Sequence, residues 1–260
     1  MRKWYQSDTA QICLSCLVVM SPDLEPVRSM WRDATRCPDG FRAPGWKVVA
    51  ADGHLAAPAG WVGVVQVLGS VVVAAPSGIA GRLSQLLMNA TSVDQLTSPG
   101  AASALYGPFR QTLGPALLLY GGMKGQPGPT PAVLGPLSND DPRVLEVLDQ
   151  AASDEVDESG LTDTTSGVFV AVDAGRPVAA CAWRRWPHSI AHFSVITAAE
   201  HRNRGFARAA ATTALGVAID AGLLPQWRAA ETNPGSIALA VSLGLQPVGR
   251  QFSVLIPTVK

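Results

Sequence analysis

Short apolar runs alternate with helix-like segments through the second half of the chain. β-branched and small apolar residues fill the runs, which is typical of buried strands, while the segments between them repeat their apolar positions every three or four residues. The turn Asp173-Ala-Gly-Arg176 joins two of the runs as a hairpin. The expected strands are 132–134, 168–172, 177–186, 190–197 and 223–227, with a last strand after 245; the expected helices are 142–152, the segment that includes 208–215, and 233–243.

The first half of the chain has a weaker pattern. It predicts a helix at 25–34, strands at 46–50, 61–68 and 71–75, a helix at 77–88 and an apolar strand or short helix at 113–120. Gly69-Ser70 is expected to be a two-residue hairpin turn. The Gly- and Pro-rich segment 121–131 lacks periodicity and is interpreted as a linker. We therefore expect an α/β (α+β) protein with a mixed sheet. We also expect the chain to be divided into a smaller accessory α/β domain (1–125) and a second domain (126–260).

Composition excludes several classes of protein. The 260 residues are 47% apolar, so the chain can bury a large core, and its formal net charge of zero argues against a nucleic-acid partner. No apolar run is long enough to span a membrane. The start of the chain faintly imitates a signal peptide, but polar residues interrupt its short apolar run and no cleavage site is evident, so we expect a cytoplasmic protein. Cys13 and Cys16 lack a second pair of ligands, so no metal site is expected.

The most informative motif follows the strand at 190–197. The turn Arg202-Asn-Arg-Gly-Phe-Ala207 leads from that strand into a helix rich in small residues. A helix N-terminus after such a turn presents free N–H groups and a positive dipole end, which suit a phosphate or pyrophosphate. The arginines at 202, 204 and 208 add positive charge. A dinucleotide-binding turn would need two more glycines, so we rank that reading low.

This turn resembles motif A of the GNAT acetyltransferases. The segment from Asn233 to Gly244 resembles motif B of the same family, and the two motifs occur in the family's order. The resemblance covers roughly 130–260 and implies a GNAT acyltransferase fold there, with acetyl-CoA as co-substrate and no metal. It also implies that 1–125 is an accessory or degenerate GNAT-like domain that shapes the acceptor pocket.

The resemblance assigns cofactor contacts residue by residue. In the family, the motif A strand binds the pantetheine arm, the turn binds the pyrophosphate, and the Asn of motif B often contacts the cofactor. The corresponding positions here are Val195, Ile196 and Thr197; Arg202, Asn203, Arg204, Gly205, Phe206 and Ala207; and Asn233. The family's strands also splay beside motif A, which admits the acetyl group.

The implied reaction is direct attack of a neutral amine on the thioester. His192 on the motif A strand and Glu231 near the end of the next strand are the main candidates for the general base, although either could have an ordinary structural role. Many relatives protonate the leaving thiolate with a Tyr seven residues after the motif B Asn, where this chain has Ala240. Ser236, Ser242 or water would take that role, or the thiolate would leave unassisted.

The acceptor is open at this stage. Small-molecule amines, peptide N-termini and protein lysines all remain, and the acidic run 153–158 could attract a cationic amine, although such a run is also common in solvated loops. The resemblance also permits a homodimer. The alternative function is a non-catalytic acyl-CoA-binding sensor or interaction protein on the same fold, which Ala240 and the weak N-terminal pattern motivate.

Overall fold

The computed structural model describes residues 24–53, 56–87, 94–97, 103, 105–122 and 131–257. The pair Cys13 and Cys16, the end of the expected helix at residue 88, and most of the expected linker lie outside these residues. The strands are β1 (Gly45–Ala50), β2 (Trp61–Val67), β3 (Ser70–Ala75), β4 (Gln111–Gly121), β5 (Val133–Leu137), β6 (Val168–Asp173), β7 (Arg176–Trp186), β8 (Ile190–Thr197), β9 (Leu224–Ala230) and β10 (Leu245–Leu255). The α-helices are α1 (Glu25–Thr35), α2 (Ser77–Leu87), α3 (Asp94–Thr97), α5 (Pro142–Asp149), α6 (Ser153–Ser159), α7 (Phe206–Asp220) and α8 (Pro234–Ser242), and short 3₁₀ helices lie at Leu161–Asp163 and Ala199–His201.

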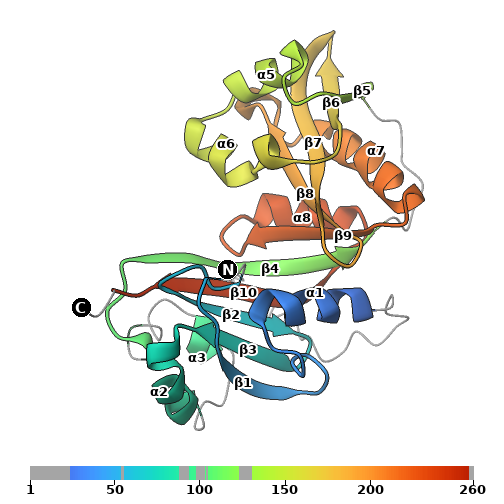
Figure 1. Ribbon diagram of the computed structural model, residues 1–260. Coiled ribbons are helices and arrows are strands. Elements are labelled where there is room, and N and C mark those ends of the chain that lie inside the picture. Colours follow the sequence, from blue (N-terminus) through green and yellow to red (C-terminus); the bar gives the residue numbers. More distant parts are fainter. Residues whose placement is uncertain are drawn as a thin grey trace, which may run out of the picture.

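The strands form one continuous mixed sheet. Their order is β1-β3-β2-β10-β4-β9-β8-β7-β6-β5. The strands of the two halves therefore interleave, because β10 lies between β2 and β4, and β4 lies between β10 and β9 (Figure 1). A domain boundary near residue 125 remains a prediction, and no break in the sheet accompanies it.

The C-terminal half contains the expected succession of strands and helices. The Asp173–Arg176 hairpin joins β6 to β7, and α5 begins at Pro142 with the Asp141 carboxylate accepting a hydrogen bond from the Arg143 amide at 2.9 Å. Helix α5 ends at Asp149, before the predicted end at 152. The acidic run 153–158 forms helix α6. This helix could not be predicted from the sequence because the run has no apolar stripe with helical spacing.

The hairpin between β2 and β3 differs from the prediction by one residue. Val67 pairs with Ser70, so the turn residues are Leu68 and Gly69. Ser70 is buried and belongs to the strand, which moves the turn back along the chain. Leu68 consequently takes the positive φ of 54° that glycine usually supplies in such turns. The segment expected as a strand or short helix at 113–120 is strand β4.

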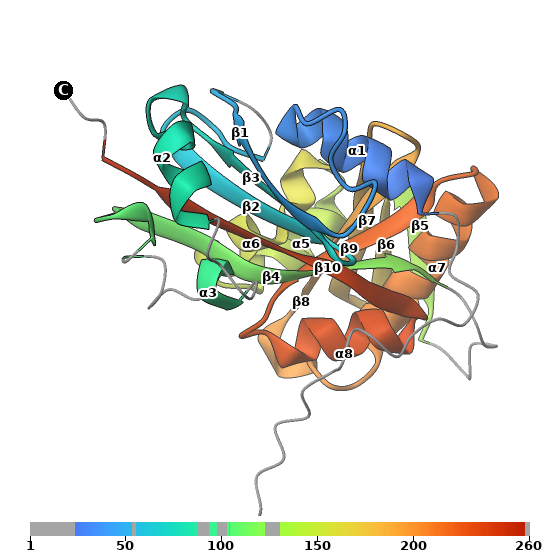
Figure 2. The same cartoon turned by 90° about the horizontal axis from the view of Figure 1, so that it is seen from below.

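Helices cover both faces of the sheet. Along β6, Phe169 and Ala171 pack toward α7, whereas Val168 and Val170 pack toward α5, so these helices lie on opposite faces. In the N-terminal half α1 covers one face, while α2 and α3 cover the other (Figure 2). The buried side of α7 consists largely of alanines, which lets this helix lie close to the sheet. None of the described helices is long and apolar enough to cross a membrane.

Candidate active site

The site begins where two parallel strands separate. β8 and β9 pair only between Ile190–His192 and Leu224–Gln226, although β8 continues to Thr197 and β9 to Ala230. β7 continues to pair with β8 through Thr197, so only the β9-facing edge of β8 is left open. The expected splay is therefore present. Three adjoining cavities lie along it, here called the cofactor-side, central and acceptor-side cavities.

The cofactor-side cavity has a volume of about 460 Å³ and lies at the N-terminal ends of α7 and α8. Every residue predicted to bind the cofactor, except Arg204, lines this cavity. Its lining includes Val195, Ile196, Thr197, Arg202, Asn203, Gly205, Phe206, Ala207 and Asn233, together with Arg208, Leu239 and Ser242. The motif residues, which are about thirty positions apart in the sequence, thus line a single cavity.

The backbone at this cavity suits an anionic ligand. Asn203 and Gly205 have φ values of 60° and 85°, which turn the chain sharply into α7. No side chain caps the start of α7, and Ala209 is the first residue whose amide bonds back to Gly205. The amides of the first helical turn are therefore available to a ligand, and the helix dipole adds positive potential there. An added Cβ at Gly205 meets no atom within 4 Å, so the backbone is open on that side.

The arginines of the turn have different roles. Arg202 forms two hydrogen bonds of 2.7 Å with the carboxylate of Glu155, and these bonds are the main cause that lowers the pKa of Glu155. Arg204 pairs with Asp173 at 2.8 Å, lies over the ring of Phe206 and is not among the residues that line the cavity; its contact with the cofactor stays a prediction. Arg208 lines the cavity and forms no ion pair within the described part of the chain.

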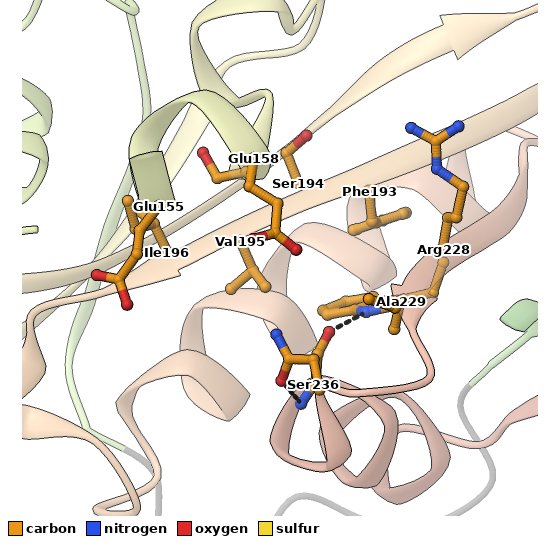
Figure 3. Close-up of a pocket in the computed structure, with 13 residues that line it drawn as sticks. Glu155, Glu158, Phe193, Ser194, Val195, Ile196, Arg228, Ala229 and Ser236 are labelled. Carbon is orange, nitrogen blue, oxygen red and sulfur yellow. Dashed lines mark hydrogen bonds between the residues drawn. The ribbon is translucent and has the colours of Figure 1, made fainter. Parts of the chain in front are cut away.

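The central cavity, of about 190 Å³, occupies the opening between β8 and β9. It shares Val195, Ile196, Asn233 and Ser236 with the cofactor-side cavity. The hydroxyl of Ser236 accepts a hydrogen bond of 2.9 Å from Trp227 Nε1, and the Ser236 amide donates to Asn233 Oδ1 at 3.0 Å (Figure 3). Ser236 is therefore held at the junction of the two cavities.

The acceptor-side cavity, of about 330 Å³, joins the central one at Glu158, Ser159, Phe193, Arg228 and Ala230. One of its walls comes from the N-terminal half, because β4 contributes Thr112, Leu113, Gly114 and Ala116; β10 adds Gln251 and Ser253. The interleaving of the halves thus builds this cavity, and the role of the N-terminal half in shaping an acceptor pocket stays a prediction.

His192 lines the acceptor-side cavity at the point where the strands separate. Its Nδ1 lies 3.1 Å from Gln226 Oε1, and its ring stacks on Trp186 with 4.4 Å between ring centroids. Gln226 Nε2 donates to the hydroxyl of Tyr120 at 2.8 Å, which directs Oε1 toward His192. His192 Nδ1 then carries the proton, and Nε2 is left with a lone pair.

The surroundings of His192 disfavour its charged form. Burial, helped by the positive charges of Arg228 and Arg184, lowers the pKa of His192 to about 3, against the opposing effect of the Gln226 hydrogen bond. The ring is therefore neutral at physiological pH, as a proton acceptor must be. It is also a weak base unless a bound ligand compensates the charge of Arg228.

Two further predicted positions lie away from the cavities. Glu231 forms a bidentate ion pair with Arg250, with contacts of 2.5 and 2.9 Å, and lines none of the three cavities. The structure does not bring it together with His192, and its catalytic role stays a prediction. Ala240 is fully buried in the core, so the position of the family's Tyr does not face the cavities. Ser242 lines the cofactor-side cavity, where its hydroxyl donates to Leu239 O.

Arg228 and Glu158 border both the central and the acceptor-side cavities. The sequence analysis does not name Arg228, whereas Glu158 belongs to the acidic run 153–158 that could attract a cationic amine. An arginine inside the apolar run that forms β9 was the available signal for Arg228. Glu158 was hidden within an acidic run whose helix was not predicted. Within the described part of the chain, no group of His, Cys, Asp and Glu could hold a metal ion.

Residues 163–251 match the family model described as GNAT acetyltransferase. No curated protein matches the chain.

Several solved structures are also similar. A putative GNAT-family acetyltransferase from Novosphingobium aromaticivorans is 20% identical, with a TM-score of 0.44 over 58% of this chain and 68% of that one. A GNAT-family acetyltransferase from Colwellia psychrerythraea is 15% identical, with a TM-score of 0.45 over 62% of each chain. A tandem GNAT protein from the clavulanic acid biosynthesis pathway is 15% identical, with a TM-score of 0.43 over 90% of this chain and 96% of that one. On the family match, the part of the chain that holds the splayed strands contains a GNAT acetyltransferase domain, in residues 163–251.

Proposed function

We propose that the protein is an acyl-CoA-dependent N-acyltransferase that transfers the acetyl group of acetyl-CoA to a primary amine in the cytoplasm. The observation that carries this proposal is the continuous row of three cavities along the splay between β8 and β9. A donor entering from the α7 end and an acceptor entering from the β4 end would meet in the central cavity.

The cofactor-side cavity fits the donor. The amides at the start of α7 and the side chain of Arg208 would hold the pyrophosphate, and the unpaired edge of β8 at Val195 to Thr197 would hydrogen-bond the pantetheine arm. Acetyl-CoA would supply an activated thioester at the central cavity. These contacts fix the reacting carbonyl in place, which is the main catalytic contribution expected of such a site.

In the proposed reaction the amine nitrogen attacks the thioester carbonyl carbon. A C–N bond forms, the C–S bond breaks, the nitrogen loses a proton, and the CoA sulfur gains one. His192 Nε2 has the free lone pair that can take the proton from the nitrogen. The hydroxyl of Ser236, held by Trp227 at the junction of the cavities, can supply a proton to the sulfur.

A non-catalytic acyl-CoA sensor is the second candidate. Two observations favour it: Ala240 is buried where many relatives carry a Tyr, and His192 has a low pKa in the unliganded protein. A sensor would bind acetyl-CoA in the same cavity without consuming it.

Thiol release from acetyl-CoA, measured with and without a panel of amines, separates the two candidates. The acyltransferase proposal predicts amine-dependent thiol release and an acetylated amine in the mass spectrum. It also predicts that Ser236→Ala lowers kcat more than Ser242→Ala, because only Ser236 borders the central cavity as well. Tight binding of acetyl-CoA without amine-dependent turnover across the panel would favour the sensor.

A further inference from the structure

Arg228 is a cation that lacks a carboxylate partner. It extends from β9 into the central and acceptor-side cavities, and its one side-chain hydrogen bond goes to the neutral amide oxygen of Gln251 at 3.2 Å. It has no ion pair within the described ranges of the chain. The surrounding protein removes water from the guanidinium, which lowers the pKa of Arg228. The side chain is nonetheless exposed on the cavity surface. An unpaired guanidinium in such a position is well matched by a planar anion that can accept two hydrogen bonds, and a carboxylate is such a group.

Glu158 is the complementary case. It extends from α6 into the same two cavities and forms no ion pair with any described residue. Its neighbour Glu155 is already paired with Arg202, so that arginine is occupied. Glu158 and Arg228 therefore line the same two cavities from different elements, and in Figure 3 the two side chains stand apart.

The two charges also differ in their position along the row of cavities. In Figure 3, Glu158 lies toward Val195 and Ile196, which continue into the cofactor-side cavity, whereas Arg228 lies on the far side of Phe193. An ammonium group at Glu158 would therefore be nearer the donor than a carboxylate at Arg228. Both side chains are exposed and line the same two cavities without an ion-pair partner among the described residues. Two such charges of opposite sign match a ligand that carries the reverse pair.

We infer that the acceptor is a small zwitterion, an amine that also carries a carboxylate, with the carboxylate held by Arg228 and the amine held beside Glu158. This inference rests on the proposed acyltransferase function and names the substrate class of the same site. The acceptor-side cavity, at about 330 Å³, suits a small metabolite of the amino acid class.

The same arrangement gives a reason for the state of His192. After burial, the charge of Arg228 is the largest cause that lowers the pKa of His192, and the charge of Arg184 lowers it further. A carboxylate bound to Arg228 would compensate the charge that has the larger effect on His192. His192 would thus become a better proton acceptor when the acceptor is in place, and the binding of the carboxylate would be coupled to the chemistry at the amine.

The direct test is calorimetric binding of matched ligands to the intact protein, with and without CoA. The probes are the α-amino acids and the ω-amino acids from β-alanine to 6-aminohexanoate, each beside its carboxamide, which keeps the amine and removes the negative charge. We expect at least one zwitterion to bind at least tenfold more tightly than its carboxamide. If no zwitterion in this panel has that advantage, the inference is wrong.

Variants locate the two contacts. Arg228→Gln should abolish the preference for the carboxylate while leaving the carboxamide's affinity unchanged, and Glu158→Gln should weaken both members of a pair. Arg185→Gln and Asp157→Asn remove the same charges from neighbouring exposed positions that do not line the cavities, and they should change nothing. A preference that survives in folded Arg228→Gln would overturn the assignment.

Parallel titration of acetyl-CoA keeps the two proposals apart. The comparison of a zwitterion with its carboxamide in the wild type needs no variant and no turnover, so a misfolded variant does not affect it. If acetyl-CoA fails to bind while the Arg228-dependent preference persists, the acyltransferase proposal fails and the zwitterion site stands. If acetyl-CoA binds and the preference is absent, the zwitterion inference alone fails.

Discussion

His192 lies at the end of a chain of buried hydrogen bonds that begins in the other half of the molecule. Trp31 Nε1 on α1 donates to the hydroxyl of Tyr120 at 2.9 Å, Gln226 Nε2 donates to the same hydroxyl at 2.8 Å, and Gln226 Oε1 faces His192. With Gln226 Nε2 directed at Tyr120, Gln226 Oε1 is left to accept a hydrogen bond from His192 Nδ1. The N-terminal half therefore helps to set the tautomer of the candidate base.

The low pKa of His192 makes the free energy of unfolding depend on pH. The folded-state pKa of about 3 lies below the unfolded value near 6.5, so the unfolded chain binds more protons between these values. The stability that the neutral ring contributes is complete above pH 6.5 and falls as the pH drops toward 3. Between pH 7 and pH 5 we expect His192 to account for a loss of about 1–2 kcal/mol.

Urea unfolding of the wild type and His192→Asn at both pH values measures this effect. The variant should lose less stability than the wild type between pH 7 and pH 5. His188→Asn is the control, because His188 is exposed and its ring pairs with the exposed Asp33. Parallel losses in the wild type and His192→Asn would contradict the neutral, desolvated state of His192.

Individual site residues were predictable only where a local motif identified them. The turn and the motif B Asn could be located in the sequence because each marks a helix N-terminus, which is a local feature, and both line the cofactor-side cavity. Glu231 is a candidate base because of its position near the end of a strand. Its ion-pair partner, Arg250, lies 19 residues further on in another strand, so the sequence around Glu231 does not reveal the pairing. The roles of Arg228 and Tyr120 depend on neighbours brought together by the sheet, and no local pattern contains that information.

At the scale of elements, the candidate site depends on two helices that both begin at the cofactor-side cavity. Helices α7 and α8 present their N-termini to the cofactor-side cavity, one without a side-chain cap and the other capped by Asn233. These elements were predictable because apolar runs, a glycine turn and an Asn-Pro helix start mark them in sequence order. Helix α6, which supplies Glu155 and Glu158, was not predicted, since seven mostly polar residues give no periodic signal.

The two Asx-Pro helix starts in the C-terminal half provide a matched comparison. Asn233 caps α8 and Asp141 caps α5, each followed by Pro, but only Asn233 lines the cofactor-side cavity. Replacing either by Ala should cost about 1 kcal/mol of unfolding free energy. Only Asn233→Ala should also weaken acetyl-CoA binding, as measured by calorimetry. Equal affinities in the two variants would mean that Asn233 is a cap and nothing more.

At the scale of the whole molecule, the two halves complete each other's sheet. β10 pairs with β2 and β4, and β4 pairs with β9. The two C-terminal strands β9 and β10 are therefore separated by β4, a strand of the N-terminal half. The order of elements could be read from the sequence, whereas this interleaving could not. Strand partners more than a hundred residues apart leave no mark on local periodicity.

The interleaving predicts that the C-terminal half does not fold alone. A fragment of residues 126–260 would leave β10 without either neighbour and expose an edge of β9. We expect it to be aggregated or to lack a cooperative urea transition, and co-expression with residues 1–125 should restore a soluble complex. A lone fragment that unfolds cooperatively and binds acetyl-CoA would contradict the interleaved arrangement.

The central claim is that acetyl-CoA binds at the start of α7, and calorimetric titration of acetyl-CoA into the wild type and Gly205→Glu tests it most directly. The substitution adds a negative charge beside the proposed pyrophosphate site, at a residue whose φ of 85° favours glycine. Gly222→Glu is the control, because Gly222 also has a positive φ and open space around it but follows the far end of α7. The account predicts micromolar binding to the wild type and to Gly222→Glu that Gly205→Glu abolishes. Absence of binding to the wild type, or equal binding to all three proteins, would contradict it.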